Sequence, residues 1–151
     1  MLSRRNRKVL SRDEKDLREG ELMIKVRDVM VSPVITVDAN TTIEEVCRIM
    51  GEKHIGSVIV TEGGKPAGIF TERDLLTKIL VKDVKLLKER VKEFMSSPLT
   101  VITPDFELRE AARIMTQLKI RRLPVVEEGQ LLGIITSADI TRAIGENPLT
   151  I

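Results

Sequence analysis

Apolar and polar positions follow two different spacings along most of the chain, which predicts short strands and short helices in a fixed order. The clearest helix signal lies in the first third, where four apolar residues fall at i, i+3, i+4 and i+7. These residues are Ile43, Val46, Cys47 and Met50. Thr41 and Thr42 precede them, with acidic residues three positions on, so either threonine is suited to open a capping box.

Strand signals flank this helix. Residues 34–37 form a β-branched run that predicts one strand, and 56–61 predict a second. The glycines of 62–65 predict a hairpin turn into a return strand at 66–70. Helical spacing resumes at Thr71, with apolar residues at Leu75, Leu76, Ile79 and Leu80.

The whole pattern then occurs a second time. Shifted by 65 positions, the sequence matches itself without a gap from Val26/Val91 to Asp74/Asp139, and 16 of these 49 positions are identical. Such a repeat indicates one β-α-β-β-α unit used twice. The second copy predicts a turn at 91–95, a strand at 99–102, a helix on Leu108, Ala111, Ala112 and Met115, strands at 123–126 and 131–136 around a turn at 128–130, and a last helix to about Ile144.

A unit of about 50 residues is below the size that usually folds alone, so the two copies should share a core. We therefore expect an α+β fold of two repeats packed through their sheets with approximate two-fold symmetry, which creates two like clefts. The expected division is a basic N-terminal arm at 1–22 with a short helix from about Asp13, a first repeat at 23–81, a packed helical connector at 82–92 on Val84, Leu87 and Val91, a second repeat at 93–145, and a tail at 146–151.

Composition narrows the function. With 42% apolar and 32% charged residues but only three Phe and no Trp or Tyr, the core must consist of Ile, Val, Leu and Met. The lack of a long apolar segment, of a signal peptide and of a second cysteine predicts a cytoplasmic protein without membrane insertion. The net charge of +2 does not favour a polyanion partner. Residues 1–20 carry seven Lys/Arg against four Asp/Glu, a local +3 that suits nucleic acid or a membrane surface, although a solvated tail is the favoured interpretation.

Several short motifs recur in the same order in both copies. They are Met30-x-x-Pro33 and Met95-x-x-Pro98, residues 54–60 and 120–126, and the two segments Gly68-x-x-Thr71-x-x-Asp74 and Gly133-x-x-Thr136-x-x-Asp139. Together, over residues 26–144, they resemble the tandem CBS domain pair, or Bateman module. The resemblance implies a stand-alone regulatory module that binds AMP, ADP or ATP, or else S-adenosylmethionine or NADH, between its repeats. It also implies a homodimer of pairs that acts on a separate regulated protein.

Asp74 and Asp139 have side chains suited to a ribose, because a carboxylate accepts two hydroxyl protons in charge-assisted hydrogen bonds. Thr71 and Thr136 stand where a strand becomes a helix, a position whose free N–H groups favour a phosphate. Thr-x-x-Asp is equally a helix-capping arrangement, and the two roles can coexist.

Arg121 and Arg122 are candidates for phosphate binding, since the planar guanidinium suits that group, and a solvated strand start is the alternative. Gly56 and Ser57 occupy their positions in the first copy, so the two clefts should differ in phosphate affinity. The family geometry implies adenine pockets, although a plain core role is at least as well supported for any one member. The implied lining is Ile35, Thr36, Val37, Gly56, Ser57, Val58, Thr100, Val101, Ile102, Leu123 and Pro124.

Nothing in the sequence predicts catalysis. It has no Gly-x-Gly-x-x-Gly, phosphate loop or nucleophile–base set, and His54 is the only histidine, so we expect neither an enzyme, nor a metal site, nor a required cofactor. Cys47 lies on an apolar helix face, where burial keeps a thiol protonated. Two alternatives stay open: a ligand-free dimerisation scaffold, and a nucleic-acid binder, which the scarcity of aromatics disfavours. For a sensor, the expected mechanism is a ligand-dependent change in the tilt of two modules in a dimer.

Overall fold

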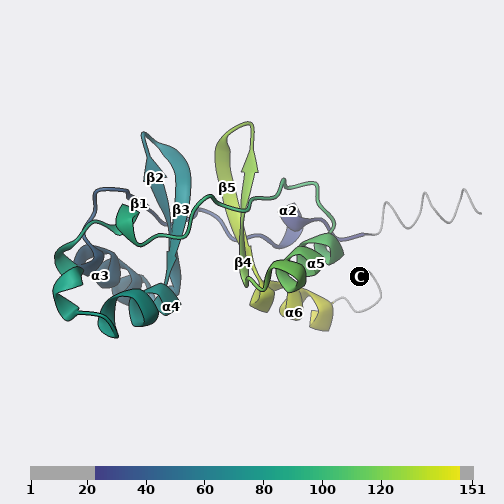
Figure 1. Cartoon of the computed structure of the whole chain (residues 1–151). Helices are drawn as coiled ribbons and strands as arrows, with labels where there is room; N and C mark the ends of the chain where they lie inside the picture. Colours follow the sequence, from purple (N-terminus) through teal and green to yellow (C-terminus); the bar gives the residue numbers. More distant parts are fainter. Residues whose placement is uncertain (1–22, 147–151) are drawn as a thin grey trace, which may run out of the picture.

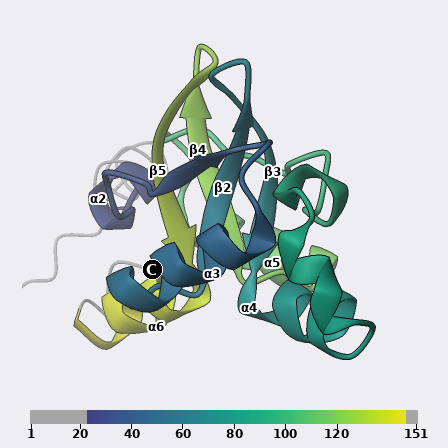
Figure 2. The ribbon, with the colours of Figure 1, turned by 90° about the vertical axis from the view of Figure 1, so that its left-hand side faces the viewer.

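The computed structural model describes residues 23–146, so the basic arm at 1–22 with its expected helix from Asp13, and the last residues 147–151, lie outside it. Two α/β units stand side by side, each with a β-hairpin whose turn projects on one side and with helices gathered on the other (Figure 1). The view turned by 90° shows the same separation of hairpin turns and helices (Figure 2). The predicted α+β architecture of two repeats is confirmed.

The first repeat follows the predicted order. Its sheet has the strand order β1-β2-β3, with β1 parallel to β2 and β2 antiparallel to β3. A short α-turn and one π-helical turn follow the sheet in place of a single regular helix. The elements are β1 (Thr36–Asp38), α3 (Ile43–Lys53), β2 (Ser57–Glu62), β3 (Lys65–Thr71), α4 (Glu72–Asp74) and the π-helical η1 (Leu75–Leu80).

The second repeat has only a two-stranded sheet. Its elements are α5 (Leu108–Leu118), β4 (Arg122–Glu127), β5 (Gln130–Thr136) and α6 (Ser137–Glu146). The strand predicted at 99–102 is wrong, because only an isolated parallel bridge joins Ile102 to Val125.

Two prolines explain the missing strand. In the first repeat, Ile59 N–H donates to the Ile35 carbonyl, and Ala39 N–H donates to the Thr61 carbonyl. The corresponding positions in the second repeat are Pro124 and Pro104, which have no N–H to donate. The pairing that remains is Ile102 N–H to the Pro124 carbonyl, at 3.1 Å, and Val126 N–H to the Ile102 carbonyl, at 2.9 Å.

The connector is helical but not one helix. It consists of two short 3₁₀ segments, η2 (Val84–Lys88) and η3 (Val91–Glu93). Val91 is fully buried, and Leu86 and Leu87 pack partly against the first core, but Val84 is exposed. The predicted apolar stripe therefore holds for Leu87 and Val91 and not for Val84.

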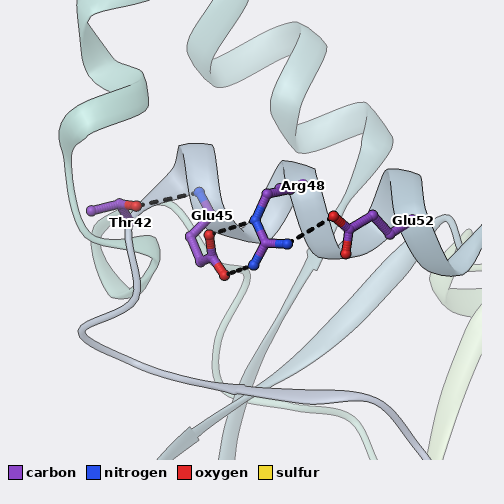
Figure 3. Close-up of polar contacts among 4 residues, drawn as sticks. All are labelled: Thr42, Glu45, Arg48 and Glu52. Atoms are coloured by element: carbon purple, nitrogen blue, oxygen red, sulfur yellow. Dashed lines mark hydrogen bonds and ion pairs between the residues drawn. The ribbon is translucent and has the colours of Figure 1, made fainter.

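Helix α3 shows how local sequence sets an element. Thr42, rather than Thr41, is its N-cap and accepts a hydrogen bond from the Glu45 amide at 3.3 Å. On the solvent side Arg48 bonds both Glu45 and Glu52, one turn to either side of it (Figure 3). The hydrogen bond from Arg48 lowers the pKa of Glu45. Opposite this polar face, the predicted apolar residues turn inward, with Ile43, Val46 and Met50 buried and Cys47 half-buried.

The segment before each repeat packs against the other repeat. Val26, in α2 (Val26–Val29), is fully buried in the core of the second repeat, and Val91 is fully buried in the core of the first. Val31 then exchanges two backbone hydrogen bonds with Ile134 of β5, and Ser96 exchanges two with Ile69 of β3. The chain thus crosses between the two sheets twice, at residues 31–35 and at 96–100.

Glycines of the repeated motif make room for this exchange. A Cβ at Gly133 would lie 2.8 Å from the sulfur of Met30, and one at Gly68 would lie 2.5 Å from the sulfur of Met95. These glycines do not have positive φ angles, so close approach rather than backbone conformation requires them. Each methionine therefore fits against the glycine of the opposite repeat.

Candidate functional site

Two clefts lie between the repeats, and most positions of their linings correspond at the repeat distance of 65. The larger, of about 670 Å³, contains Asp74 and is called the Asp74 cleft. The smaller, of about 260 Å³, contains Asp139 and is called the Asp139 cleft. The Asp74 cleft is lined by Ile69, Thr71, Arg73, Asp74, Ser96, Pro98, Leu99, Thr100, Lys119, Ile120, Arg121, Arg122 and Pro124. The Asp139 cleft is lined by Val31, Pro33, Val34, Ile35, Ile55, Gly56, Ser57, Ile59, Arg122, Ile134, Thr136 and Asp139.

Both repeats contribute to each cleft because of the two crossings. Residues 31–35 leave the second sheet at Ile134 and line the Asp139 cleft on their way to β1. Residues 96–100 leave the first sheet at Ile69 and line the Asp74 cleft in the same manner. The Thr-x-x-Asp segment of one repeat thus faces the strand start of the other.

Asp74 is held at the start of α4 by a complete capping box. Its Oδ2 accepts from the Thr71 amide at 2.9 Å and from the Thr71 hydroxyl at 3.1 Å, and its own amide donates to the Thr71 oxygen at 3.2 Å. Its Oδ1 pairs with the Lys78 ammonium at 3.1 Å. The carboxylate is buried, and both of its oxygens have partners in this arrangement.

Asp139 repeats the geometry at the start of α6. Its Oδ2 accepts from the Thr136 amide and from the Thr136 hydroxyl, both at 2.9 Å, and its amide donates back at 3.2 Å. Here Arg142 takes the place of Lys78 and lies 3.0 Å from Oδ1. The capping alternative considered for both motifs is therefore realised.

Capping leaves room for one further interaction at each aspartate. A carboxylate oxygen has two lone pairs. Oδ2 of Asp74 uses both on Thr71, whereas Oδ1 uses one on Lys78. One acceptor position at Oδ1 remains for a ligand hydroxyl, so these contacts do not accommodate two hydroxyls at once unless the capping box opens.

The clefts differ strongly in charge. Four basic residues line the Asp74 cleft, and against Asp74 they give four positive charges minus one, or +3. These are Arg73, Lys119, Arg121 and Arg122. The positions equivalent to them in the first repeat or in α6 are Ala138, His54, Gly56 and Ser57. The Asp139 cleft has Arg122 alone against Asp139, a formal charge of zero.

The residues suggested for adenine pockets separate into three groups. Ile35, Gly56 and Ser57 line the Asp139 cleft, and Thr100 and Pro124 line the Asp74 cleft. Others are core residues that line neither cleft: Val37, Val58, Ile102 and Leu123. Val101 is 44% exposed away from both clefts, and Thr36 faces an open hollow of about 790 Å³ between the two hairpin turns.

Several lining residues were not assigned from sequence. Lys119 and Arg73 add charge to the Asp74 cleft, and isoleucines line both clefts. The repeat could have indicated the isoleucines, because Ile69 and Ile120 correspond to Ile134 and Ile55. It could not have indicated Arg73 and Lys119, whose counterparts Ala138 and His54 do not line the Asp139 cleft.

Other kinds of site find no support among residues 23–146. In that range no three His, Cys, Asp or Glu residues are placed to hold a metal ion. The same range contains no helix with the length and apolar character needed to span a bilayer. Burial, with a smaller contribution from Glu44, raises the pKa of the Cys47 thiol.

Comparison with known proteins agrees with this geometry. A family model described as "CBS domain" matches residues 26–81 and again 91–146. The CBS domain-containing protein YhcV of Bacillus subtilis is 34% identical over 118 residues, which cover 78% of this chain and 84% of YhcV. Two further curated relatives are longer, so that the match covers 61% and 63% of their lengths.

Two solved structures are informative. The CBS domain pair of protein MJ0100, in complex with 5′-methylthioadenosine and S-adenosyl-L-methionine, has a TM-score of 0.75 at 28% identity and covers 83% of this chain and 98% of its own. A hexameric CBS-CP12 protein from bloom-forming cyanobacteria has a TM-score of 0.76 at 31% identity, covering 83% and 76%.

Proposed function

Because the chain belongs to the CBS-domain family, we propose that it is a non-catalytic regulatory module that binds an adenosine-containing ligand in the clefts between its repeats. AMP, ADP and ATP are the favoured ligands, and the phosphates bind in the Asp74 cleft. A partner protein distinguishes the ligand-bound module from the ligand-free one.

The main support for this proposal is the positive charge of the Asp74 cleft. Arg122 begins β4 and Arg121 directly precedes it, and with Lys119 and Arg73 they form a basic lining of the cleft. Arginine forks suit phosphate oxygens, and several cations in a concave site concentrate that preference. The volume of about 670 Å³ lies in the usual range for small-molecule sites.

The adenosine end of the ligand is supported from two sides. Thr100, Leu99 and Pro124 provide a mainly apolar lining on the crossing segment and β4, and Oδ1 of Asp74 retains one acceptor position for a ribose hydroxyl. The related MJ0100 pair binds two adenosine-containing molecules. S-adenosylmethionine therefore remains a ligand to test beside the nucleotides.

Regulation follows from where the ligand binds. It contacts a crossing segment and the Thr-x-x-Asp segment of opposite repeats, so its binding favours one relative position of the two. We propose that a homodimer of such pairs presents this change to the partner, which requires different ligand affinities for the two arrangements. Light scattering measures the oligomer, and small-angle scattering with and without nucleotide measures the change.

A scaffold without ligand is the second candidate. It is favoured by the complete capping boxes, since Asp74 and Asp139 have structural roles that need no ligand.

Calorimetric and thermal-shift titrations with AMP, ADP, ATP, S-adenosylmethionine and NADH separate the two candidates. A ligand at about 100 times its dissociation constant stabilises the folded state by about 2.7 kcal/mol. We expect the nucleotide effect to fall in the double variant Lys119→Gln/Arg121→Gln, which leaves the caps intact. His54→Gln, at the position equivalent to Lys119 in the first repeat, is the matched control and should leave the nucleotide effect unchanged. If none of the five ligands stabilises the wild-type protein, the scaffold function is the better description.

A further inference from the structure

Arg122 holds a special position between the clefts. Among the described residues it is the one that lines both. It begins β4, and its Nη2 atom lies 2.8 Å from the point that a Cβ on Gly56 would occupy. The absence of a side chain at Gly56 lets the guanidinium of one repeat reach across to the other.

The guanidinium is available to a ligand. Arg122 is half-buried, and within residues 23–146 it makes no side-chain hydrogen bond or ion pair. Glu72 is the nearest acid in this contact, with its carboxylate carbon 3.6 Å from the same point at Gly56, but the two do not form an ion pair. A free cation at the boundary of two clefts can turn toward either.

The two clefts depend on this cation to different degrees. Without Arg122 the Asp74 cleft still has Arg73, Lys119 and Arg121. The Asp139 cleft has no other Lys or Arg in its lining. One planar guanidinium cannot chelate phosphates in both clefts at once.

We propose that Arg122 is a shared phosphate ligand that couples the two clefts antagonistically. This inference rests on the proposed function. A phosphate-bearing ligand in the Asp74 cleft draws Arg122 away and weakens binding of phosphate-bearing ligands in the Asp139 cleft. Coupling between sites is reciprocal, so occupancy of the Asp139 cleft weakens the Asp74 cleft by the same factor. Adenosine, which has no phosphate, does not engage Arg122 and does not show this antagonism.

The NMR signals of isoleucine δ1-methyl groups report ligand binding in each cleft separately. Ile35 and Ile134 line the Asp139 cleft, while Ile69 and Ile120 line the Asp74 cleft. Titration with AMP, and separately with adenosine, then yields a dissociation constant for each cleft in one sample.

The titrations are repeated on four proteins that form a double-mutant cycle. They are the wild type, a variant with a weakened Asp74 cleft, Arg122→Gln, and the variant that combines both changes. The cleft is weakened by Asp74→Asn, and independently by Lys119→Gln/Arg121→Gln, which leaves the capping box untouched. We expect either change to tighten AMP in the Asp139 cleft about tenfold, the scale of one charge-assisted hydrogen bond. In the Arg122→Gln protein, weakening the Asp74 cleft should leave the dissociation constant of AMP in the Asp139 cleft unaltered.

The outcomes are distinct. If weakening the Asp74 cleft leaves AMP affinity in the Asp139 cleft unchanged, or if that cleft binds no AMP in any background, the shared-ligand inference is overturned and nucleotide binding at the Asp74 cleft stands. Equal coupling with adenosine overturns it as well, since a phosphate is then not the cause. If no isoleucine methyl in either cleft responds to AMP, ADP, ATP, S-adenosylmethionine or NADH, the proposed function itself fails.

Discussion

A single added methyl group tests how the repeats dock. In Gly68→Ala the new Cβ would lie 2.5 Å from the sulfur and 2.7 Å from Cγ of Met95, and 3.0 Å from the Ser96 carbonyl oxygen. Carbon contacts are normally about 3.5–4.0 Å, so Met95 must move by about 1 Å. The Ser96 backbone, bonded to Ile69 in both directions, is harder to displace.

These short contacts determine how much stability Gly68→Ala is expected to lose. Overpacking of this kind costs about 1–3 kcal/mol. Replacing glycine by alanine also restricts the unfolded chain, which by itself stabilises the folded state by about 0.4–1 kcal/mol. The expected net loss for Gly68→Ala is about 1–2 kcal/mol in free energy of unfolding, or about 2–8 °C in Tm for a chain of this size. Gly133→Ala should lose less, because its closest contact, the Met30 sulfur, is at 2.8 Å.

Urea and thermal unfolding followed by circular dichroism measure the effect. Gly51→Ala is the matched control, because Gly51 lies in α3 and a Cβ there meets nothing within 4 Å. Alanine at that position should stabilise the protein by about 0.4–1 kcal/mol. If Gly68→Ala is as stable as Gly51→Ala, close approach of the crossing segment is not the reason for glycine at position 68.

Three further predictions concern the first repeat and its counterpart. Thr42→Ala removes the N-cap of α3 and should cost about 1 kcal/mol in urea unfolding, whereas Glu107→Ala at the equivalent position should cost much less, since Glu107 makes no capping bond. Cys47 should react with iodoacetamide more slowly at pH 8 than in the urea-unfolded chain, because burial raises its pKa and keeps the thiol protonated; equal rates would contradict that burial. Arg48→Ala should raise the pKa of Glu45 in NMR titration. The lowered pKa stabilises the fold above the unfolded value of about 4.3 and this contribution is lost at lower pH, so the variant should show a weaker acid dependence of stability.

The order of elements could be predicted from sequence because each depends on nearby residues. Thr42 and the apolar spacing of α3 determine that helix locally, and the glycine turns determine both hairpins. The loss of the strand at 99–102 depends on Pro104 and Pro124, whose missing N–H groups can be read from the sequence once the first repeat shows which amides are needed.

The crossing of the segments could not be predicted in this way. Nothing in the sequence around Val31 favours one sheet over the other, and long-range contacts place it on the second: Val26 is buried in the second core and Met30 packs against Gly133. The clefts were located correctly between the repeats, but the suggested adenine pockets were too broad. Consecutive residues of an extended chain point to opposite sides, so a triplet such as 35–37 cannot face one cleft as a whole. Ile35 lines the Asp139 cleft, whereas Thr36 faces the open hollow between the two hairpin turns.

The same short segments dock the two repeats and line the proposed ligand site. Met95 fits against Gly68, Ser96 pairs with Ile69, and within four residues Thr100 lines the Asp74 cleft. A ligand there must therefore contact a segment whose position is set by the docking of one repeat on the other. Because only the docked arrangement has this cleft, ligand binding and docking stabilise each other through linkage. In the duplicated, exchanged arrangement, binding of a ligand in this cleft is therefore coupled to the docking of the two units.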